Sequence, residues 1–275
     1  MFFEVGIKAS ARNETQINSS CSESAKVSNF HHNVGNAFGM YFTLADYVAV
    51  AGAYKSICKV IIFANTDRRS VEGCTFCAGA DLKYVKTQAG ESGTSGFLDS
   101  VLSTMNRIDR FPKPVIAALN GITLAGGLEL VLCCDLVLAA RSAKIGDAHA
   151  NYGLLPGGGG SVRLPRVIGP TRAKYLLFTG DFVDAADLVE AGLVNQVVDD
   201  DQLESVAQAV ADKIATKSPL GLRRMKTLVD DGLQQPLDTA LRLELLASEV
   251  HSHSADLHEG LAAFNEKRTP RFTGH

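Results

Sequence analysis

The stretch NGITLAGGLEL at residues 120–130 combines glycines, the predicted start of a helix and one carboxylate. The first N–H groups of a helix have no partner within it, and the helix dipole favours negative charge there. Gly126 and Glu129 are three residues apart, so both can face one cavity at the helix start. An N–H donor beside a carboxylate suits proton abstraction next to a carbonyl group, because the donor holds the developing oxyanion while the carboxylate takes the proton.

A purely structural role for Glu129 is the alternative, in which its charge only complements the helix dipole. The residues that follow it, 130–134, are all apolar or cysteine. Such a run is not typical of a solvated helix, so it favours a buried carboxylate with a functional role.

A second stretch that could do chemistry is CAGADL at residues 77–82. Successive small residues after a loop allow the backbone to approach a ligand closely, and Gly79 tolerates conformations that other residues avoid. The same pattern is typical of a tight turn between a strand and a helix, so this stretch alone leaves both interpretations open.

The elements that must position these residues alternate along the chain. Short apolar runs predict buried strands at residues 59–64, 114–119 and 136–140. A buried helix is predicted at residues 127–134, and an apolar pattern at residues 36–54 favours another helix. Strands separated by helices indicate an α/β fold with crossover connections.

The C-terminal part of the chain shows helical patterns only. Residues 203–214 repeat apolar side chains at helical spacing. Residues 254–267 predict a last helix with Ser254 as its N-cap. We therefore expect an α/β core at residues 1–200 and a helical region at residues 201–275.

The composition excludes several classes of function. The formal net charge of the 275 residues is −3, so no global basic field is present to attract nucleic acid or anionic lipid. No apolar run reaches the roughly 20 residues that a membrane helix needs. The six cysteines lack the spacing of a small disulfide-stabilised domain, which favours reduced thiols. We expect a cytoplasmic protein without nucleic-acid or membrane partners.

Two further patterns are weak as signals of metal or phosphate binding. Cys74 and Cys77 have the spacing of half a zinc site, but no second Cys/His pair lies at a suitable distance. The glycine run 157–160 lacks the Gly-Lys-Ser/Thr ending of a phosphate-binding loop. We expect no metal site, and we expect the glycine run to provide close backbone packing and a helix start beside the pocket.

Four motifs in order indicate a family more specifically than any one of them. They are CAGADL at 77–82, PVIAALNGITLAGGLEL at 114–130, GLLPGGGGSVRLPR at 153–166 and EGLAAFNEKRTPRF at 259–272. Together they resemble the crotonase superfamily, the enoyl-CoA hydratase/isomerase family, over residues 36–272. The resemblance implies an α/β fold, a crotonase-like spiral of ββα units with a C-terminal helical trimerisation region.

The resemblance also implies roles for individual residues. Ala78 and Gly126 match the two positions whose N–H groups form the oxyanion hole, and Glu129 matches the first of the two catalytic glutamates of the hydratases. The positions that bind the coenzyme A part of the substrate are matched by Ala80, Asp81, Leu82, Lys83, Phe264 and Lys267.

The implied ligand is an acyl-CoA thioester, with no cofactor other than the coenzyme A that belongs to the substrate. The implied assembly is a homotrimer or a dimer of trimers, in which Phe264 and Lys267 reach the nucleotide end of coenzyme A in a neighbouring subunit. We expect the charges of Lys267 and Arg268 to be free for its phosphates, since they stand at the end of a helix.

One position departs from the family pattern. Alignment on residues 145–146 and 153–157 places His149 where the hydratases carry their second catalytic glutamate. Histidine can act as acid or base near neutral pH. The change alters geometry and charge, and it disfavours classical double-bond isomerisation. His149 as a residue of the pocket wall is the alternative, and Asp147 is a candidate to orient it.

The function that follows is hydration of a 2-enoyl-CoA by a lyase, through an enolate held in a backbone oxyanion hole, with Glu129 and His149 moving protons. One alternative is another crotonase reaction, namely hydrolysis or carbon–carbon cleavage of an acyl-CoA or a β-dicarbonyl. The other is a non-catalytic or RNA-binding relative. The absence of a Lys/Arg run disfavours RNA binding, and the presence of Glu129 disfavours a non-catalytic protein.

Overall fold

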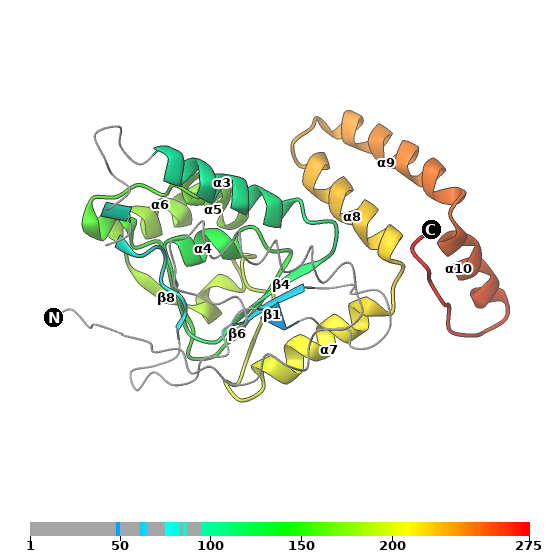
Figure 1. The fold of residues 1–275 in the computed structure, drawn as a ribbon, viewed down its shortest axis with the longest axis horizontal. Coiled ribbons are helices and arrows are strands. Elements are labelled where there is room, and N and C mark those ends of the chain that lie inside the picture. The colour runs from blue at the N-terminus through cyan, green and yellow to red at the C-terminus, as the bar shows by residue number, and fades with distance from the viewer. Residues whose placement is uncertain (1–47, 50–60, 65–74, 83–84, 87–94) are drawn as a thin grey trace.

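The computed structural model describes residues 48–49, 61–64, 75–82, 85–86 and 95–275. Within these ranges the chain forms two β-sheets, helices that cover them, and a helical C-terminal part that extends to one end of the molecule (Figure 1). The predicted α/β class is confirmed.

The larger sheet has five strands in the order β1-β2-β4-β6-β9. Strands β2, β4, β6 and β9 are parallel, and β1 is antiparallel to β2. The strands are β1 (Val48–Ala49), β2 (Ile61–Ala64), β4 (Val115–Leu119), β6 (Leu136–Ala140) and β9 (Gln196–Val198). All three predicted strands are therefore confirmed. The helix favoured for residues 36–54 is wrong at β1, where the backbone pairs with β2, and its other residues lie outside the described ranges.

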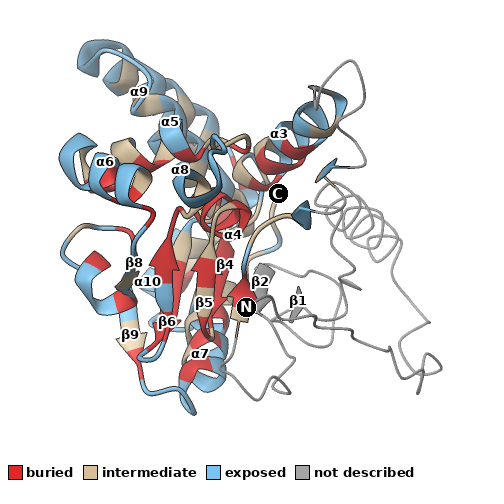
Figure 2. Ribbon diagram, turned by 90° about the vertical axis from the view of Figure 1, so that its left-hand side faces the viewer, coloured by how far each residue is buried: buried red, intermediate tan, exposed pale blue. Residues whose placement is uncertain are grey.

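Strand β4 lies between two hydrophobic layers, and all five of its residues are buried. Its residues 115, 117 and 119 pack with helices α3 (Ser95–Asp109) and α4 (Gly126–Val131). Its residues 116 and 118 pack with helix α7 (Leu203–Ala215) on the opposite face. Side chains alternate between the faces of a strand, so a strand covered on both faces is apolar throughout. Figure 2 shows the buried residues concentrated in β4, β6 and α4.

The smaller sheet has four strands in the order β3-β5-β7-β8. Strands β3, β5 and β7 are parallel, and β8 is antiparallel to β7. The strands are β3 (Thr75–Cys77), β5 (Ile122–Leu124), β7 (Lys144–Gly146) and β8 (Phe182–Asp184). None of the four was predicted from the sequence, although this sheet positions the site described below.

The remaining helices follow the two sheets along the chain. They are α5 (Gly160–Ile168), α6 (Pro170–Thr179), α8 (Pro219–Gly232), α9 (Leu237–Ser252) and α10 (Ala255–Asn265), with short 3₁₀ turns η2 (His149–Tyr152) and η3 (Ala185–Leu188). Ser254 is the N-cap of α10, as predicted, and its hydroxyl accepts a hydrogen bond from the N–H of Leu257 at 3.2 Å. In the part of the chain that the structure describes, no helix is long and apolar enough to cross a membrane.

Candidate active site

The site lies where the three parallel strands of the smaller sheet end. Residue Ala78 follows β3, Ala125 and Gly126 follow β5, and Asp147 follows β7. Because parallel strands end at the same edge of a sheet, their carboxyl ends bring these segments together, as in other open α/β sheets. The sheet therefore places the small-residue turn, the start of α4 and the loop before His149 next to one another.

The turns after β3 and β5 touch through their backbones. Gly79 has φ +96°, and a Cβ added there would lie 3.2 Å from the N atom of Gly126. A Cβ on Gly127 would lie only 2.1 Å from the carbonyl O of Cys77, so α4 packs directly against the end of β3. Ala125 adopts φ 49°, which a non-glycine residue adopts at a cost of about 1–3 kcal/mol. Strain of this kind persists at sites whose surroundings hold the backbone in place.

Glu129, in the first turn of α4, is 3% exposed. Its Oε1 accepts hydrogen bonds from the N–H groups of Gly158 at 2.7 Å and Gly160 at 2.9 Å. Burial raises the pKa of Glu129 above its ordinary value, although the N–H group of Gly160, the charge of His149 and the N–H group of Gly158 each oppose the change. The carboxylate is thus desolvated and held in one orientation, as a positioned base requires.

The glycine run 157–160 is itself anchored by Arg163. One guanidinium nitrogen donates to the carbonyl of Gly158 at 2.9 Å, and the other donates to Oδ1 of Asn106 on α3 at 2.8 Å. The run provides close packing and the start of α5, as predicted, and its N–H groups also orient Glu129. That second role was not predicted, because it joins residues 29 and 31 positions apart.

We expect Gly158→Ala to reduce activity more than it reduces stability. A Cβ there would lie 2.8 Å from Oε2 of Glu129, so the carboxylate or the loop must shift. Displacement of a reacting group by about 1 Å can cost about 100-fold in rate. Steady-state kinetics and thermal unfolding measure the two effects. Gly96→Ala is the matched control, since its Cβ meets nothing within 4 Å, and unchanged kinetics in Gly158→Ala would contradict the role of the loop.

His149 begins the turn after β7, close enough to Glu129 for their charges to interact. Its ring Nδ1 lies 3.0 Å from Oδ1 of Asp147, and its side chain keeps 13% exposure, so part of the ring remains accessible. Burial alone lowers the pKa of His149, but the hydrogen bond and charge of Asp147, together with the charge of Glu129, outweigh it and raise the pKa above 6.5. The structure therefore brings the two predicted acid–base residues together.

The family model of enoyl-CoA hydratase/isomerase matches residues 55–275, which include this whole site. The chain belongs to the enoyl-CoA hydratase/isomerase family. The resemblance seen in the four motifs is confirmed, and with it the crotonase fold.

Three proteins illustrate this family likeness. The human enoyl-CoA hydratase domain-containing protein 2, mitochondrial, is 40% identical over 220 residues, which are 78% of this chain and 73% of that protein. The crotonyl-CoA hydratase of Syntrophomonas wolfei is 39% identical over 199 residues, covering 72% and 76%. A crystal structure of enoyl-CoA hydratase from Bacillus anthracis superposes with a TM-score of 0.74 at 40% identity, covering 80% of this chain and 83% of that one.

The other residues expected from the family pattern are spread more widely. Ala80, Asp81 and Leu82 continue the turn after β3 next to Ala78, and Lys83 lies outside the described residues. Phe264 is on α10 and is 82% exposed, and Lys267 follows that helix. Figure 1 shows α10 at the opposite end of the molecule from α6, beyond α8, so one chain does not bring these two residues to α4.

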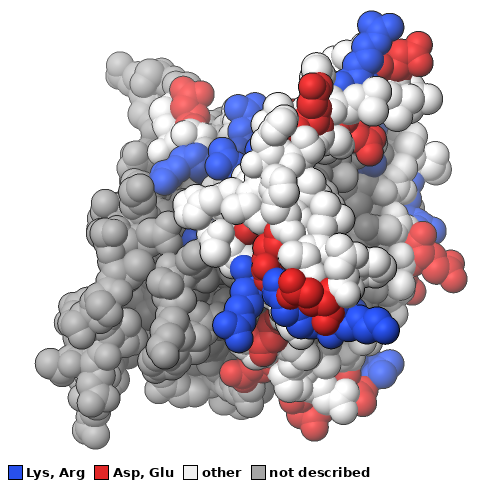
Figure 3. All heavy atoms as spheres, turned by 90° about the vertical axis from the view of Figure 1, so that its right-hand side faces the viewer, with Lys and Arg blue, Asp and Glu red and all other residues white. Residues whose placement is uncertain are grey.

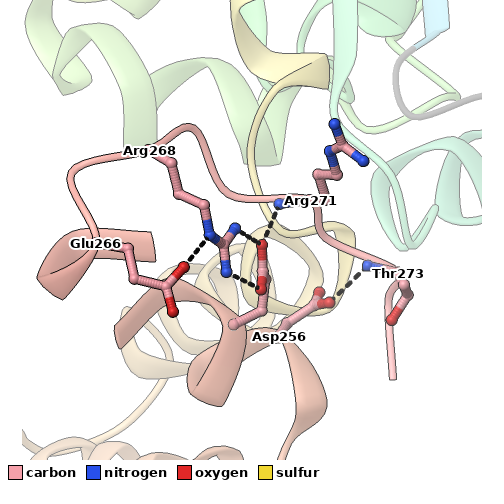
Figure 4. Close-up of polar contacts among 6 residues, drawn as sticks. Asp256, Glu266, Arg268, Arg271 and Thr273 are labelled. Atoms are coloured by element: carbon pink, nitrogen blue, oxygen red, sulfur yellow. Dashed lines mark hydrogen bonds and ion pairs between the residues drawn. The ribbon is translucent and has the colours of Figure 1, made fainter. Parts of the chain in front are cut away.

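The expectation that Arg268 is free for phosphate binding is wrong. Its guanidinium forms a two-point ion pair with Glu259, at 2.6 and 2.9 Å, and a third contact with Glu266 (Figure 4). The hydrogen bond from Arg268 is the first cause that lowers the pKa of Glu259, to about 2. Arg268 thus holds the C-terminal segment on α10, whereas Lys267 is exposed and remains a candidate for phosphate binding.

The buried side chain of Asp256 holds the same C-terminal segment. It is 2% exposed, and its carboxylate accepts from the N–H of Thr273 at 2.7 Å and of Gly274 at 3.0 Å (Figure 4). The hydroxyl of Ser218, the N-cap of α8, also donates to it at 2.5 Å. The carboxylates of Glu259 and Asp256 therefore have a structural role, which is to hold the C-terminal segment in place. Among the residues that the structure describes, no group of three or more His, Cys, Asp or Glu could hold a metal ion.

Proposed function

We propose that this enzyme adds water to the double bond of a 2-enoyl-CoA thioester. The observation that carries the proposal is the buried carboxylate of Glu129 at the start of α4. The N–H groups of Gly158 and Gly160 orient this carboxylate, and its charge interacts with that of His149. The crotonyl-CoA hydratase among its relatives supports the same reaction.

In this mechanism each group has one task. The N–H groups of Ala78 and Gly126 hold the thioester oxygen, which gains negative charge as water adds to the β-carbon. Ionised Glu129 takes a proton from the attacking water, and protonated His149 gives a proton to the α-carbon. The product is a 3-hydroxyacyl-CoA, after which Glu129 and His149 exchange their protons with solvent.

A second candidate is another reaction of the family, hydrolysis or carbon–carbon cleavage of an acyl-CoA or a β-dicarbonyl. The Asp147–His149 pair favours it, because a histidine oriented by a carboxylate also serves hydrolytic reactions. Binding of RNA receives less support, since Figure 3 shows acidic and basic side chains interspersed on the face with the C-terminal helices.

A panel of 2-enoyl-CoA and 3-enoyl-CoA thioesters of increasing chain length tests the proposal. The absorbance of the conjugated thioester should fall as a 2-enoyl-CoA is hydrated, and mass spectrometry should find a product heavier by one water. Release of free coenzyme A or a shortened acyl chain would instead establish the second candidate. No turnover of any 2-enoyl-CoA would refute the hydratase assignment.

We expect kcat/KM to follow a bell-shaped pH profile. Its acid limb should lie above 4.5, because Glu129 must be ionised and burial raises its pKa. Its alkaline limb should lie above 6.5, because protonated His149 is the acid and Asp147 raises its pKa. Initial rates at constant ionic strength from about pH 4 to 10 give both limbs. An activity that rises steadily through neutral pH would contradict protonated His149 as the donor.

The helical region 201–275 is the proposed oligomerisation region, in a homotrimer or a dimer of trimers. Helices α8 and α9 have no buried residue in the single chain, and Figure 2 shows α9 mostly exposed. Large apolar side chains are exposed along α8, α9 and α10, including Met225, Val229, Leu233, Leu237, Leu241, Leu245, Leu246, Val250 and Leu261. An apolar surface of this extent is typical of a protein–protein interface.

Light scattering at micromolar concentration should therefore give the mass of a trimer or hexamer of the 29.3 kDa chain. Leu245→Glu should lower that mass, because it places a charge among the exposed apolar residues of α9. Val189→Glu, at an exposed apolar position outside these helices, is the control. A monomeric wild-type mass would contradict the assembly.

The same assembly would bring Phe264 and Lys267 to the coenzyme A of a neighbouring subunit, because they lie far from α4 in their own chain. Calorimetry should find that Lys267→Ala weakens coenzyme A binding in a salt-dependent way. The absence of any additional cofactor and the cytoplasmic location stay predictions. The named human relative is a mitochondrial protein.

A further inference from the structure

Asp147 is the one acidic residue in contact with the His149 ring among the described residues, and its environment is unusual for a carboxylate. It is 1% exposed, and its Oδ1 accepts from both the backbone N–H of His149 at 3.2 Å and the ring Nδ1 at 3.0 Å. Its Oδ2 is also buried and accepts no hydrogen bond from any residue in the described ranges. A buried carboxylate with so few donors gains most from a cationic partner.

The backbone between the two residues is shaped to bring them together. Ala148 adopts the left-handed conformation, with φ 63° and ψ −10°. This conformation costs a non-glycine residue about 1 kcal/mol or more. It turns the chain between Asp147 and His149, and Nδ1 of the ring lies 3.0 Å from the carboxylate two residues before it.

The contact between Nδ1 and Asp147 therefore fixes the orientation of the His149 ring. With Nδ1 donating to Asp147, Nε2 is the ring nitrogen that remains to exchange a proton with a substrate, and the side chain as a whole keeps 13% exposure. The charged groups that act on the ring are Asp147 from its own turn and Glu129 from α4. Helix α6, which packs against the same turn, carries Arg172, Lys174 and Tyr175 at exposed positions.

We propose that Asp147 is a positioning residue for the reaction, which orients His149 through Nδ1 and holds it as an imidazolium that donates its Nε2 proton to the substrate. The inference rests on the proposed function for the identity of the reaction, but the Asp147–His149 pairing itself is a separate property. It also explains how a histidine can replace the second glutamate of the family pattern. The paired carboxylate favours the protonated imidazole, so that position can still supply an acid.

The decisive variant is Asp147→Asn, which keeps the size of the side chain and removes its charge. Histidine ¹⁵N spectra of the labelled full-length protein, recorded as a function of pH, report the protonation of each ring nitrogen. The His149 signals are identified among the seven histidines by their loss in His149→Gln. We expect the pKa of His149 to fall in Asp147→Asn, and kcat at neutral pH to fall by about tenfold to a hundredfold, the range known for loss of a group that orients a functional histidine.

The pH profile separates positioning from a merely structural role. The alkaline limb of kcat/KM should move to lower pH in Asp147→Asn, whereas the acid limb should move little, since Asp147 is the weakest influence on Glu129. Asp147→Glu, which retains the charge, should restore part of the lost rate. Asp184→Asn, on the neighbouring strand β8, is the control for loss of an acidic charge from the same sheet.

Three results have distinct meanings. An unchanged pKa of His149 in a folded Asp147→Asn, or a loss of rate that is equal at every pH, overturns the inference. A lowered pKa together with a shifted alkaline limb supports it. A lowered pKa in a protein that hydrates none of the thioesters supports the Asp147–His149 pairing while the hydratase assignment fails.

Discussion

Glu129→Gln is expected to reduce turnover of the true substrate by at least about a hundredfold. Loss of a positioned general base typically costs about 10²- to 10⁴-fold in rate. The amide has the same shape, and its oxygen can still accept the N–H groups of Gly158 and Gly160. The loop should therefore stay in place, and the loss of rate should report the chemistry alone. Steady-state kinetics measures it, with Glu190→Gln, an exposed position, as the control.

The same variant should be at least as stable as the wild type at neutral pH. The folded state raises the pKa of Glu129, so folding favours its protonated form. The stabilisation from that protonated form is complete below about pH 4.5 and is lost as the pH rises through the higher folded value. The amide introduced by Glu129→Gln does not ionise, so the variant does not lose stability in this way as the pH rises. Thermal unfolding at pH 7.5 tests it, and a clearly lower Tm would mean that the ionised carboxylate is a structural requirement.

His149→Ala is expected to reduce turnover by a similar factor, because it removes the acid that protonates the α-carbon. It should also abolish the alkaline limb of the pH profile, whereas Glu129→Gln should remove the acid limb. The pocket-wall interpretation predicts only a small effect. Crotonyl-CoA hydration at the wild-type rate by His149→Ala would rule out the two-residue mechanism.

His149→Glu should hydrate crotonyl-CoA faster than His149→Ala, since it restores the pair of carboxyl groups found in the hydratases. Asp147 lies beside the introduced carboxyl group, and repulsion between two acids raises the pKa of one of them. The introduced group would then keep its proton and act as an acid. Equal rates for the two variants would show that geometry at this position, and not the presence of an acid, limits the reaction.

Much of the local chemistry and several elements could be predicted from the sequence. Glu129 and Gly126 were identified as candidates because the strand, the glycine pair and the helix start are consecutive, and the geometry of a helix start is local. Strand β6 has its predicted bounds at residues 136–140, since a short apolar run between breakers is itself the signal of a buried strand. The start of α10 was found for the same reason, because the Ser254 hydroxyl accepts a hydrogen bond from the N–H group of Leu257, only three residues further along the chain.

The smaller sheet could not be predicted in this way. Strands β3, β5 and β7 have three residues each, which is too short for a period of two to be distinguished from chance. They are held as strands by pairing with one another, so their conformation is decided by contacts between segments far apart in the chain. Position in the sequence alone could not show that three turns meet at one edge.

The amino-acid sequence by itself determined the family, the candidate chemical groups and the departure from the family pattern at His149, because these depend on residue types and their order. Only the tertiary structure decided which groups act on each other. Glu129 receives its hydrogen bonds from Gly158 and Gly160, and Arg268 is paired with Glu259. Burial and charge act through space, so the raised pKa values of Glu129 and His149 follow from packing between segments that the chain order does not place side by side.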